Sequence, residues 1–272
     1  MNGNFAPPAP WSNVSLMRPA TIFITGASSG IGRALALEYV RKGAHVAIAA
    51  RRAPELARVA SEARAIAQKG GQIRVFPLDV REPRAVFETV QRAERELGSL
   101  DCVIANAGAG SYQHISTMSW DDVERAIDIN IRGAIATILA AVPIMLSQQR
   151  GQLVGVSSLA GRRGMPYSAM YSASKSALST FLESIRIELA PAGVKVTDVQ
   201  PGFVDTSMVL TLKGRVPTPW MCSPQKAAHI MVRRLERAPA VIAFPWPLDV
   251  WSSIGRFLPT FMYDRLARLA AL

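Results

Sequence analysis

The sequence predicts an α/β fold in which a mostly parallel, seven-stranded sheet carries helices on both of its faces. Seven apolar runs rich in Ile and Val are each too short for a typical helix, so we expect them to form buried strands. Stretches with helical spacing separate these runs along the chain. Because parallel neighbours must be joined by right-handed crossovers, this alternation predicts the doubly wound arrangement.

The expected elements alternate between strand and helix along the chain. Strands are expected near residues 20–22, 45–49, 73–76, 101–104, 152–156, 194–199 and 240–244. Helices are expected over residues 30–42, 53–69, 83–97, 120–148, 169–190 and 224–237. The longest uncharged segment, residues 133–149, is interrupted by Pro143 and is shorter than the roughly 20 apolar residues that span a bilayer. We therefore expect it to be a buried helix.

The pattern indicates one catalytic domain over residues 18–245, because no repeat, charge block or low-complexity tract marks an internal boundary. Residues 1–17 contain three prolines and lack the pattern of a secretory signal, so we expect a disordered leader. Residues 246–272 form an amphipathic tail, with arginines placed among aromatic and aliphatic residues. One hypothesis is that this tail rests on a membrane surface. The alternatives are that it closes over the substrate cleft or contacts another subunit.

Composition narrows the class of function. The formal charge of +11 comes mostly from scattered arginines, and no basic helix interleaved with aromatic residues predicts nucleic-acid binding. The two cysteines offer neither a disulfide framework nor the spacing of metal ligands. We therefore expect a cytoplasmic protein, either free or peripheral at a membrane surface, that requires no metal.

A glycine-rich segment from Thr25 to Gly32 joins the first strand to the first helix. A pyrophosphate requires free backbone N–H groups at a helix N-terminus, and glycines let the chain approach the phosphates closely. The preceding strand and the following helix make this pattern specific for a dinucleotide. A purely structural turn is the alternative.

The end of the second strand predicts which dinucleotide binds. An acidic residue at this place takes the ribose 2′-hydroxyl of NAD, whereas an arginine can bind the 2′-phosphate of NADP. Here the strand ends in Ala49-Ala50-Arg51-Arg52, so NADP(H) is favoured and Arg51 is the expected phosphate ligand. Arg52 is more readily explained as a solvent-exposed residue.

Tyr171 and Lys175 lie four residues apart at the start of a long expected helix, so both side chains share one face. A nearby ammonium favours the phenolate, which would let Tyr171 exchange a proton near neutral pH. Tyr167 has no lysine at this spacing, and we expect it to pack or to line the cleft.

Taken together, the motifs resemble those of the short-chain dehydrogenase/reductase family, in that family's order and spacing over residues 18–245. They comprise Thr25-Gly-x-x-x-Gly-x-Gly32, Asn106-Ala-Gly108, Asn130, Ser158, Tyr171-x-x-x-Lys175 and Pro201-Gly202. One departure is Ala105, where many relatives carry a second Asn. The resemblance implies a Rossmann-type fold and an oxidoreductase that acts on CH–OH groups with a nicotinamide cofactor.

The resemblance also implies roles for single residues. Tyr171 would be the general acid/base, Lys175 would lower its pKa and hold the nicotinamide ribose, and Ser158 would hydrogen-bond the reacting oxygen. Asn130 would anchor a water of the proton relay. Besides Arg51, Tyr171 and Lys175, the expected cofactor contacts are Gly26, Ser28, Ser29, Gly30, Ile31, Asp79, Val80, Asn106, Ala107, Gly108, Pro201, Gly202 and Thr206.

The expected substrate is a lipophilic ketone or aldehyde, because residues 203–220 are rich in apolar side chains that suit a cleft wall. Packing of these side chains against their own domain explains the pattern equally well. Residues 109–115 and 159–166 would complete that wall. A sensor that binds NADPH without turnover is the main alternative, and the intact Ser158, Tyr171 and Lys175 argue against it. A sugar-nucleotide epimerase or dehydratase would carry a longer substrate domain.

The helices at 120–148 and 169–190 resemble those through which relatives form homodimers and homotetramers.

Overall fold

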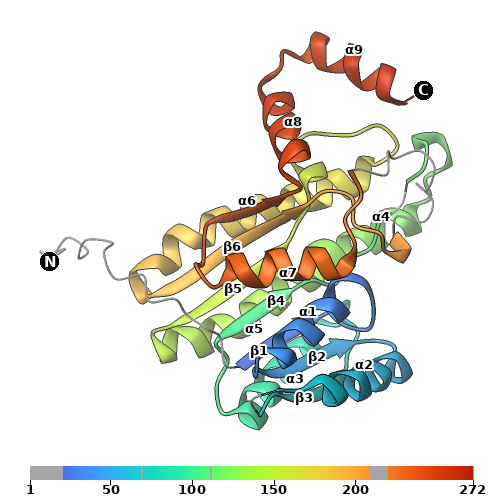
Figure 1. The fold of residues 1–272 in the computed structure, drawn as a ribbon. Helices are drawn as coiled ribbons and strands as arrows, with labels where there is room; N and C mark the ends of the chain where they lie inside the picture. Colours follow the sequence, from blue (N-terminus) through green and yellow to red (C-terminus); the bar gives the residue numbers. More distant parts are fainter. Residues whose placement is uncertain (1–20, 69, 111, 209–219, 272) are drawn as a thin grey trace, which may run out of the picture.

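Seven parallel strands form one sheet in the computed structural model, which describes residues 21–68, 70–110, 112–208 and 220–271 (Figure 1). The sheet order is β3-β2-β1-β4-β5-β6-β7, which confirms the predicted doubly wound α/β fold. The predicted leader over residues 1–17 lies outside the described residues. The strands are β1 (Thr21–Thr25), β2 (His45–Ala50), β3 (Gln72–Pro77), β4 (Cys102–Ala105), β5 (Gly151–Val156), β6 (Val194–Pro201) and β7 (Val241–Phe244).

Helices connect the strands and extend beyond the last one. They are α1 (Gly30–Arg41), α2 (Ala53–Ile66), α3 (Pro83–Leu97), α4 (Trp120–Ala126), α5 (Ala134–Gln148), α6 (Ala169–Leu189), α7 (Pro224–Leu235), α8 (Trp246–Phe257) and α9 (Thr260–Ala271). Most predicted boundaries agree to within a few residues. The predicted helix 120–148 is helical throughout, but a π-helical segment, Ile127–Gly133, lies between α4 and α5.

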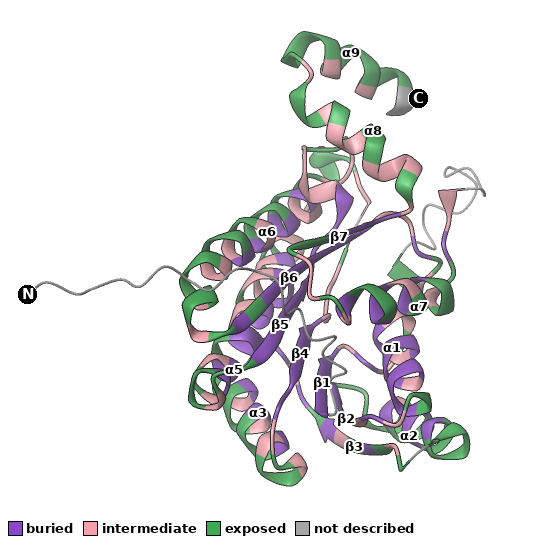
Figure 2. Ribbon diagram, turned by 60° about the vertical axis from the view of Figure 1, so that its left-hand side comes forward, coloured by how far each residue is buried: buried purple, intermediate pink, exposed green. Residues whose placement is uncertain are grey.

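Both faces of the sheet are buried, which explains why its strands are continuously apolar. Successive side chains of β1 point to opposite faces: Ile22 and Ile24 belong to one core cluster, and Phe23 belongs to the other. Helices α1, α2 and α7 supply the first cluster, while α3, α5 and α6 supply the second. Figure 2 shows the buried strands between helices whose outer faces are exposed.

Local sequence signals fix several helix ends. Ser119 and Asp122 form a reciprocal capping box at the start of α4. Ser223 caps α7 by accepting a hydrogen bond from the backbone N–H of Lys226. Helix α3 ends at Gly98, whose φ of 81° lies in the left-handed region that favours glycine.

The continuous helical stretch Trp120–Gln148 is long and apolar enough to cross a membrane by length and composition alone. More than half of its most apolar window, 56%, is nevertheless buried inside the protein. Ile138, Ala141 and Met145 of α5 pack in the core cluster beneath the sheet. The stretch Trp120–Gln148 therefore packs as a core helix of the domain.

Candidate active site

The turn between β1 and α1 packs tightly against the end of β4. Gly26 has a φ of 69°, and a Cβ at this position would lie 2.7 Å from the Cα of Ala107. A Cβ at Gly32 would lie 2.5 Å from Nδ2 of Asn106. Asn106 Nδ2 donates to the Thr25 carbonyl at 2.9 Å, and the Thr25 hydroxyl accepts from the Asn106 backbone N–H at 3.1 Å. Glycine is therefore required at both positions to let the two loops meet.

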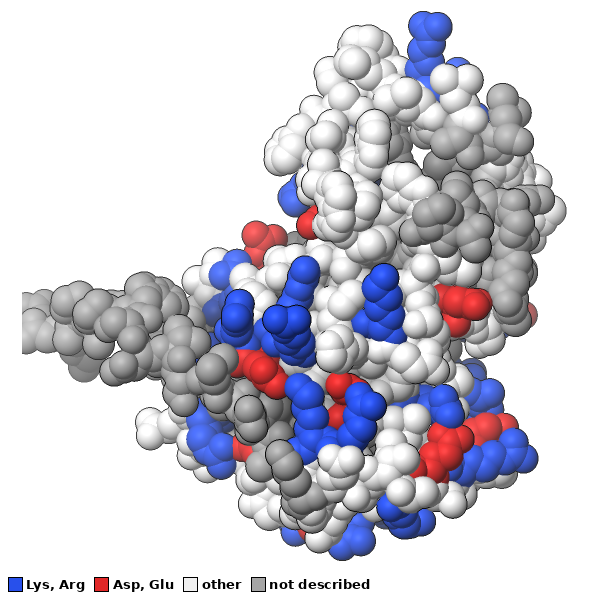
Figure 3. Space-filling model, viewed as in Figure 1, with Lys and Arg blue, Asp and Glu red and all other residues white. Residues whose placement is uncertain are grey.

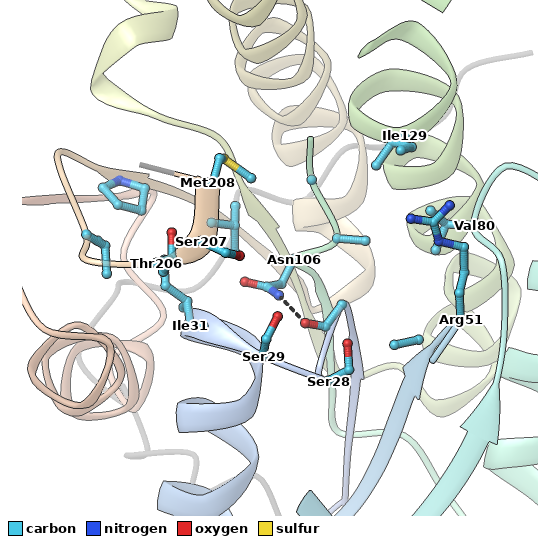
Figure 4. A pocket seen from close by; sticks show the side chains of 18 of the residues that line it. Ser28, Ser29, Ile31, Arg51, Val80, Asn106, Ile129, Thr206, Ser207 and Met208 are labelled. Carbon is cyan, nitrogen blue, oxygen red and sulfur yellow. Dashed lines mark hydrogen bonds between the residues drawn. The ribbon is translucent and has the colours of Figure 1, made fainter. Parts of the chain in front are cut away.

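A pocket of about 430 Å³ opens at the carboxyl ends of the strands, on both sides of the point where the chain order reverses. Figure 4 shows Arg51 and Val80 on one side of it, and Thr206 and Met208 on the other. All sixteen residues that the sequence analysis named as cofactor contacts line this pocket. Lining residues that it did not assign to the cofactor are Ala50, Arg52, Leu78, Arg125, Ile129, Val156, Ser157, Val204, Ser207 and Met208.

Two arginines follow β2, and both line the pocket. Arg52 extends over the glycine-rich turn, where its Nη2 donates to the hydroxyls of Ser28 at 3.0 Å and Ser29 at 2.9 Å. The sequence favours Arg51 over Arg52 as the phosphate ligand and does not predict this contact, because the direction of a side chain at a strand end depends on the neighbouring turn. Arg51 is about half exposed, and its Nη1 lies 4.0 Å from Oδ2 of Asp79.

Asp79 follows β3 and is held by arginines. Arg81 binds both carboxylate oxygens of Asp79 through its side chain and also donates its backbone N–H. Burial would raise the pKa of Asp79, but the hydrogen bonds and charge of Arg81, with the charge of Arg51, lower it overall. Asp79 therefore stays ionised at neutral pH and partly offsets the positive charge of this side of the pocket.

Tyr171 and Lys175 lie on the first turns of α6, with the Lys175 ammonium 5.9 Å from the centre of the Tyr171 ring. Burial lowers the pKa of Lys175 to about 8, while the charge of Asp198 acts in the opposite direction. Lys175 Nζ donates to the Val156 carbonyl at 2.8 Å, which fixes it at the end of β5.

The pKa of Tyr171 is raised above the ordinary value of 10, because burial disfavours the phenolate and the hydrogen bond with Ser158 offsets burial only in part. The expected lowering of this pKa by Lys175 is therefore not found in the protein without cofactor, where burial decides the direction.

Ser158 follows β5 and is held in place by backbone groups. Its hydroxyl donates to the Pro201 carbonyl at 3.2 Å and accepts from the backbone N–H of Ala160 at 3.1 Å. Ser158 also hydrogen-bonds Tyr171, which lines the pocket, although Ser158 itself is not among the lining residues. The Tyr171 and Ser158 hydroxyls are therefore neighbours, and a substrate oxygen could accept from both once the Ser158 O–H turns away from the Pro201 carbonyl.

Asn130 is fully buried in the π-helical segment and does not line the pocket directly. Its side chain accepts from the Ala109 N–H at 2.8 Å and donates to the Ala109 carbonyl at 2.7 Å and to the Ser174 hydroxyl at 2.9 Å. A Cβ at Gly108 would lie 3.4 Å from Lys175 Nζ and 3.5 Å from Asn130 Oδ1. Asn130 thus fixes the loop after β4 next to Lys175. Such π-helical insertions are frequent at functional sites.

The loop after β6 covers the pocket from the other side. A Cβ at Gly30 would lie 3.1 Å from Cγ2 of Thr206, so this loop contacts the glycine-rich turn. Met208 reaches to within 3.1 Å of the Cβ position of Gly110, beside the ring of Tyr171. Part of the predicted substrate wall, residues 209–219, lies outside the described residues.

Tyr167, the alternative tyrosine, packs away from this arrangement. Its ring lies 5.2 Å from that of Tyr112 and 5.8 Å from that of His114. Its backbone carbonyl accepts from the N–H of Gln113 at 2.8 Å. Within the described part of the chain, no three His, Cys, Asp or Glu side chains gather as a metal site would require.

Known proteins share both the sequence and the fold. A family model described as short chain dehydrogenase matches residues 20–215. An uncharacterised oxidoreductase of Myxococcus xanthus is 42% identical over 248 residues, which cover 91% of this chain and 96% of that protein. An uncharacterised oxidoreductase of Staphylococcus aureus is 38% identical over 188 residues, which cover 69% and 79% of the two chains.

Solved structures are similar across most of the chain. A short-chain type dehydrogenase/reductase from Mycobacterium marinum has a TM-score of 0.76 at 28% identity, covering 85% of this chain and 95% of its own. An alcohol dehydrogenase from Thermococcus sibiricus, complexed with 5-hydroxy-NADP, has a TM-score of 0.74 at 27% identity, with coverage of 82% and 94%. The pocket described above therefore lies in a fold for which a nicotinamide cofactor complex is known.

Proposed function

Because the chain belongs to the short-chain dehydrogenase family of nicotinamide-dependent oxidoreductases, we propose that it reduces a lipophilic ketone or aldehyde with NADPH. One observation carries the proposal. Tyr171, which hydrogen-bonds Ser158, and Lys175 line the same pocket as Arg51 and Arg52. The first three groups suit proton transfer to a carbonyl oxygen, and the two arginines suit a phosphate.

The residues present fit NADP(H). The glycine-rich turn offers backbone N–H groups at the start of α1 with no Cβ in the way, as a pyrophosphate requires. Arg51 and Arg52 would hold the 2′-phosphate, since guanidinium groups bind phosphate in a bidentate manner and no acidic residue follows β2 directly. Asp79 and Val80 would lie at the adenine, and Lys175 at the nicotinamide ribose.

When bound, NADPH supplies the hydride that reduces the carbonyl carbon. Ser158 and Tyr171 hydrogen-bond the carbonyl oxygen and stabilise the negative charge that develops on it. Tyr171 then gives its phenolic proton to that oxygen, and Lys175 stabilises the phenolate that remains. The raised pKa of Tyr171 keeps the phenol protonated before the reaction, which suits a proton donor.

The apolar side chains around the reacting end support a lipophilic substrate. Met208 and the ring of Tyr171 both approach Gly110, and Val204 also lines the pocket. A preference for NADP further favours reduction in the cell.

We also propose that the protein forms a dimer or tetramer through the helices α5 and α6, which expose Leu139, Leu146 and Ile187. We further propose a cytoplasmic location.

The direct test follows NADPH and NADH oxidation at the nicotinamide absorbance across ketones, aldehydes, quinones and steroids. Tyr171→Phe should abolish turnover while NADPH binding, measured by cofactor fluorescence, persists. Tyr167→Phe is the matched control, because the ring that packs against Tyr112 is retained. Substantial activity in Tyr171→Phe would refute the assigned role, and NADPH binding without turnover on any compound would favour the sensor.

The cofactor preference has its own test. Arg52→Ala should weaken NADPH binding by about tenfold or more, because charge-assisted hydrogen bonds to the phosphate are lost, and should leave NADH binding little changed. Arg64→Ala, an exposed arginine on α2, is the control. An equal loss for both cofactors would show that Arg52 acts through the turn that it contacts and not through the 2′-phosphate.

A further inference from the structure

Helix α8 turns its polar side toward the protein and its apolar side toward solvent. Arg162, in the loop after β5, donates to the Asp249 carboxylate at 2.7 Å and to the hydroxyls of Ser252 and Ser253, both at 2.8 Å. A helix on the surface of a globular protein normally packs through its apolar side. The apolar side chains that α8 exposes instead are Trp246, Val250, Trp251, Ile254 and Phe257.

Helix α9 is attached in the same way. The guanidinium of Arg163 lies 3.9 Å from the centre of the Tyr263 ring and donates to the Leu258 carbonyl at 2.7 Å. The Tyr263 hydroxyl donates to the Gly164 carbonyl. The apolar side chains that α9 exposes are Phe261, Met262, Leu266 and Leu269.

We call these nine side chains of α8 and α9 the tail surface. Its two most exposed members, Phe257 and Phe261, are 83% and 76% exposed. The two helices project from the end of the molecule (Figure 1), and the projecting part is largely uncharged in Figure 3. Contiguous apolar surface of this kind marks an interaction site, because monomeric proteins rarely leave it in water.

The charges beside the tail surface favour lipid over a second copy of the chain. Arg256, Arg265 and Arg268 are exposed, while Asp249 is paired with Arg162. Asp264 is the remaining acidic residue in the tail. In a two-fold contact this surface would face its own copy, so its excess of positive charge would be opposed by the same excess, whereas anionic headgroups would complement it.

The residue types and their placement agree with that choice. A hollow on α9 is lined by Phe261, Asp264, Arg265, Arg268 and Leu269, so two guanidinium groups, one carboxylate and two apolar side chains share one surface. Tryptophan is favoured at the boundary between acyl chains and headgroups, and Trp246 and Trp251 are 74% and 64% exposed. The net charge of +11 adds attraction to an anionic membrane.

We propose that α8 and α9 dock this protein on an anionic lipid surface, with the tail surface at the acyl boundary and the three arginines at the headgroups. The proposal does not depend on the substrate. It has a consequence for the site, because the residues that hold the tail, Arg162 and Arg163, lie in the loop between Ser158 and Tyr171. Docking therefore brings the lipid surface next to the loop that joins two residues of the active site.

Flotation of the full-length protein with vesicles tests the proposal. We expect binding to vesicles that contain phosphatidylglycerol, weak binding to pure phosphatidylcholine, and a decrease with added salt. Phe257→Ser with Phe261→Ser should reduce bound protein at least about tenfold, because two large side chains no longer enter the interface. Tryptophan emission should shift to shorter wavelength on binding in the parent and not in the variant.

Matched variants separate docking from misfolding and self-association. Trp120→Ser removes a large apolar side chain that is 69% exposed elsewhere on the protein, and it should leave flotation unchanged. Arg265→Gln with Arg268→Gln should reduce binding to the anionic vesicles about tenfold or more. Full-length protein that stays soluble with both vesicle types would overturn the proposal. A tail variant that converts a dimer to a monomer while flotation is unchanged would also overturn it and assign the surface to a second copy.

Discussion

Replacing Lys175 with methionine should separate two effects of its ammonium group: the stability that the protein loses by burying the charge, and the contribution of the charge to the reaction. The Lys175 side chain is almost completely buried, and its pKa is lowered to about 8 from the ordinary 10.5. A lysine with such a pKa costs about 3 kcal/mol when folded in its charged form. Methionine has a similar length and carries no charge, so the variant does not incur this cost.

The sign of the pH dependence follows from the lowered pKa. Below pH 8, Lys175 is charged in both the folded and the unfolded protein, and the full cost is present. As the pH rises from 8 toward 10.5, the folded protein releases the proton first, and the cost disappears. At pH 7 we expect Lys175→Met to be as stable as the parent or more stable, because the unpaired Val156 carbonyl costs about 1 to 3 kcal/mol against the charge that is removed.

The measurement is urea denaturation of both proteins at pH 7 and pH 10. The free energy of unfolding of the parent, relative to the variant, should rise by about 2 to 3 kcal/mol between these pH values. Comparing the two proteins at each pH cancels the titration of groups that they share. Turnover should be lost at both pH values. A relative stability that does not change with pH would refute the argument that Lys175 is charged at a cost.

Three other substitutions test the packing of the site and core. Gly32→Ala should lower the free energy of unfolding by about 1 to 3 kcal/mol and weaken cofactor binding, because its Cβ would lie 2.5 Å from Asn106 Nδ2; unchanged denaturation and cofactor titrations would contradict this. Asn130→Ala should cost about 3 kcal/mol in urea denaturation, since a buried side chain loses three hydrogen bonds, and a loss under 1 kcal/mol would show that the loop rearranges. Tyr39→Phe should raise the melting temperature, because the buried Tyr39 hydroxyl has no partner among the described residues; a lower value would reveal one.

The fold was predictable because each strand carries its own signal. Continuous apolar runs mark strands buried on both faces, and the glycines and polar residues after them mark the carboxyl edge. The π-helical segment around Asn130 was not predictable, since its apolar spacing does not differ from that of an ordinary helix over so few residues.

The details of the site that depend on side-chain direction could not be predicted from the sequence. Arg51 and Arg52 are adjacent residues of the same type, and only the structure shows that Arg52 reaches the serines of the glycine-rich turn. The tail could be recognised as amphipathic, but its inverted orientation depends on Arg162, more than 80 residues earlier in the chain. Contacts across such a separation leave no periodic pattern in the sequence.

The strand order also determines the order in which the sheet can be assembled during synthesis. The first four strands, residues 21–105, already form the complete half-sheet β3-β2-β1-β4, closed by the pairing of Ile22 with Cys102. Strands β5, β6 and β7 then add one after another at a single edge. The glycine-rich turn belongs to the early half, whereas Ser158, Tyr171 and Lys175 belong to the late one. A nascent chain can therefore shape its phosphate-binding turn before any residue of the proton-transfer group has been made.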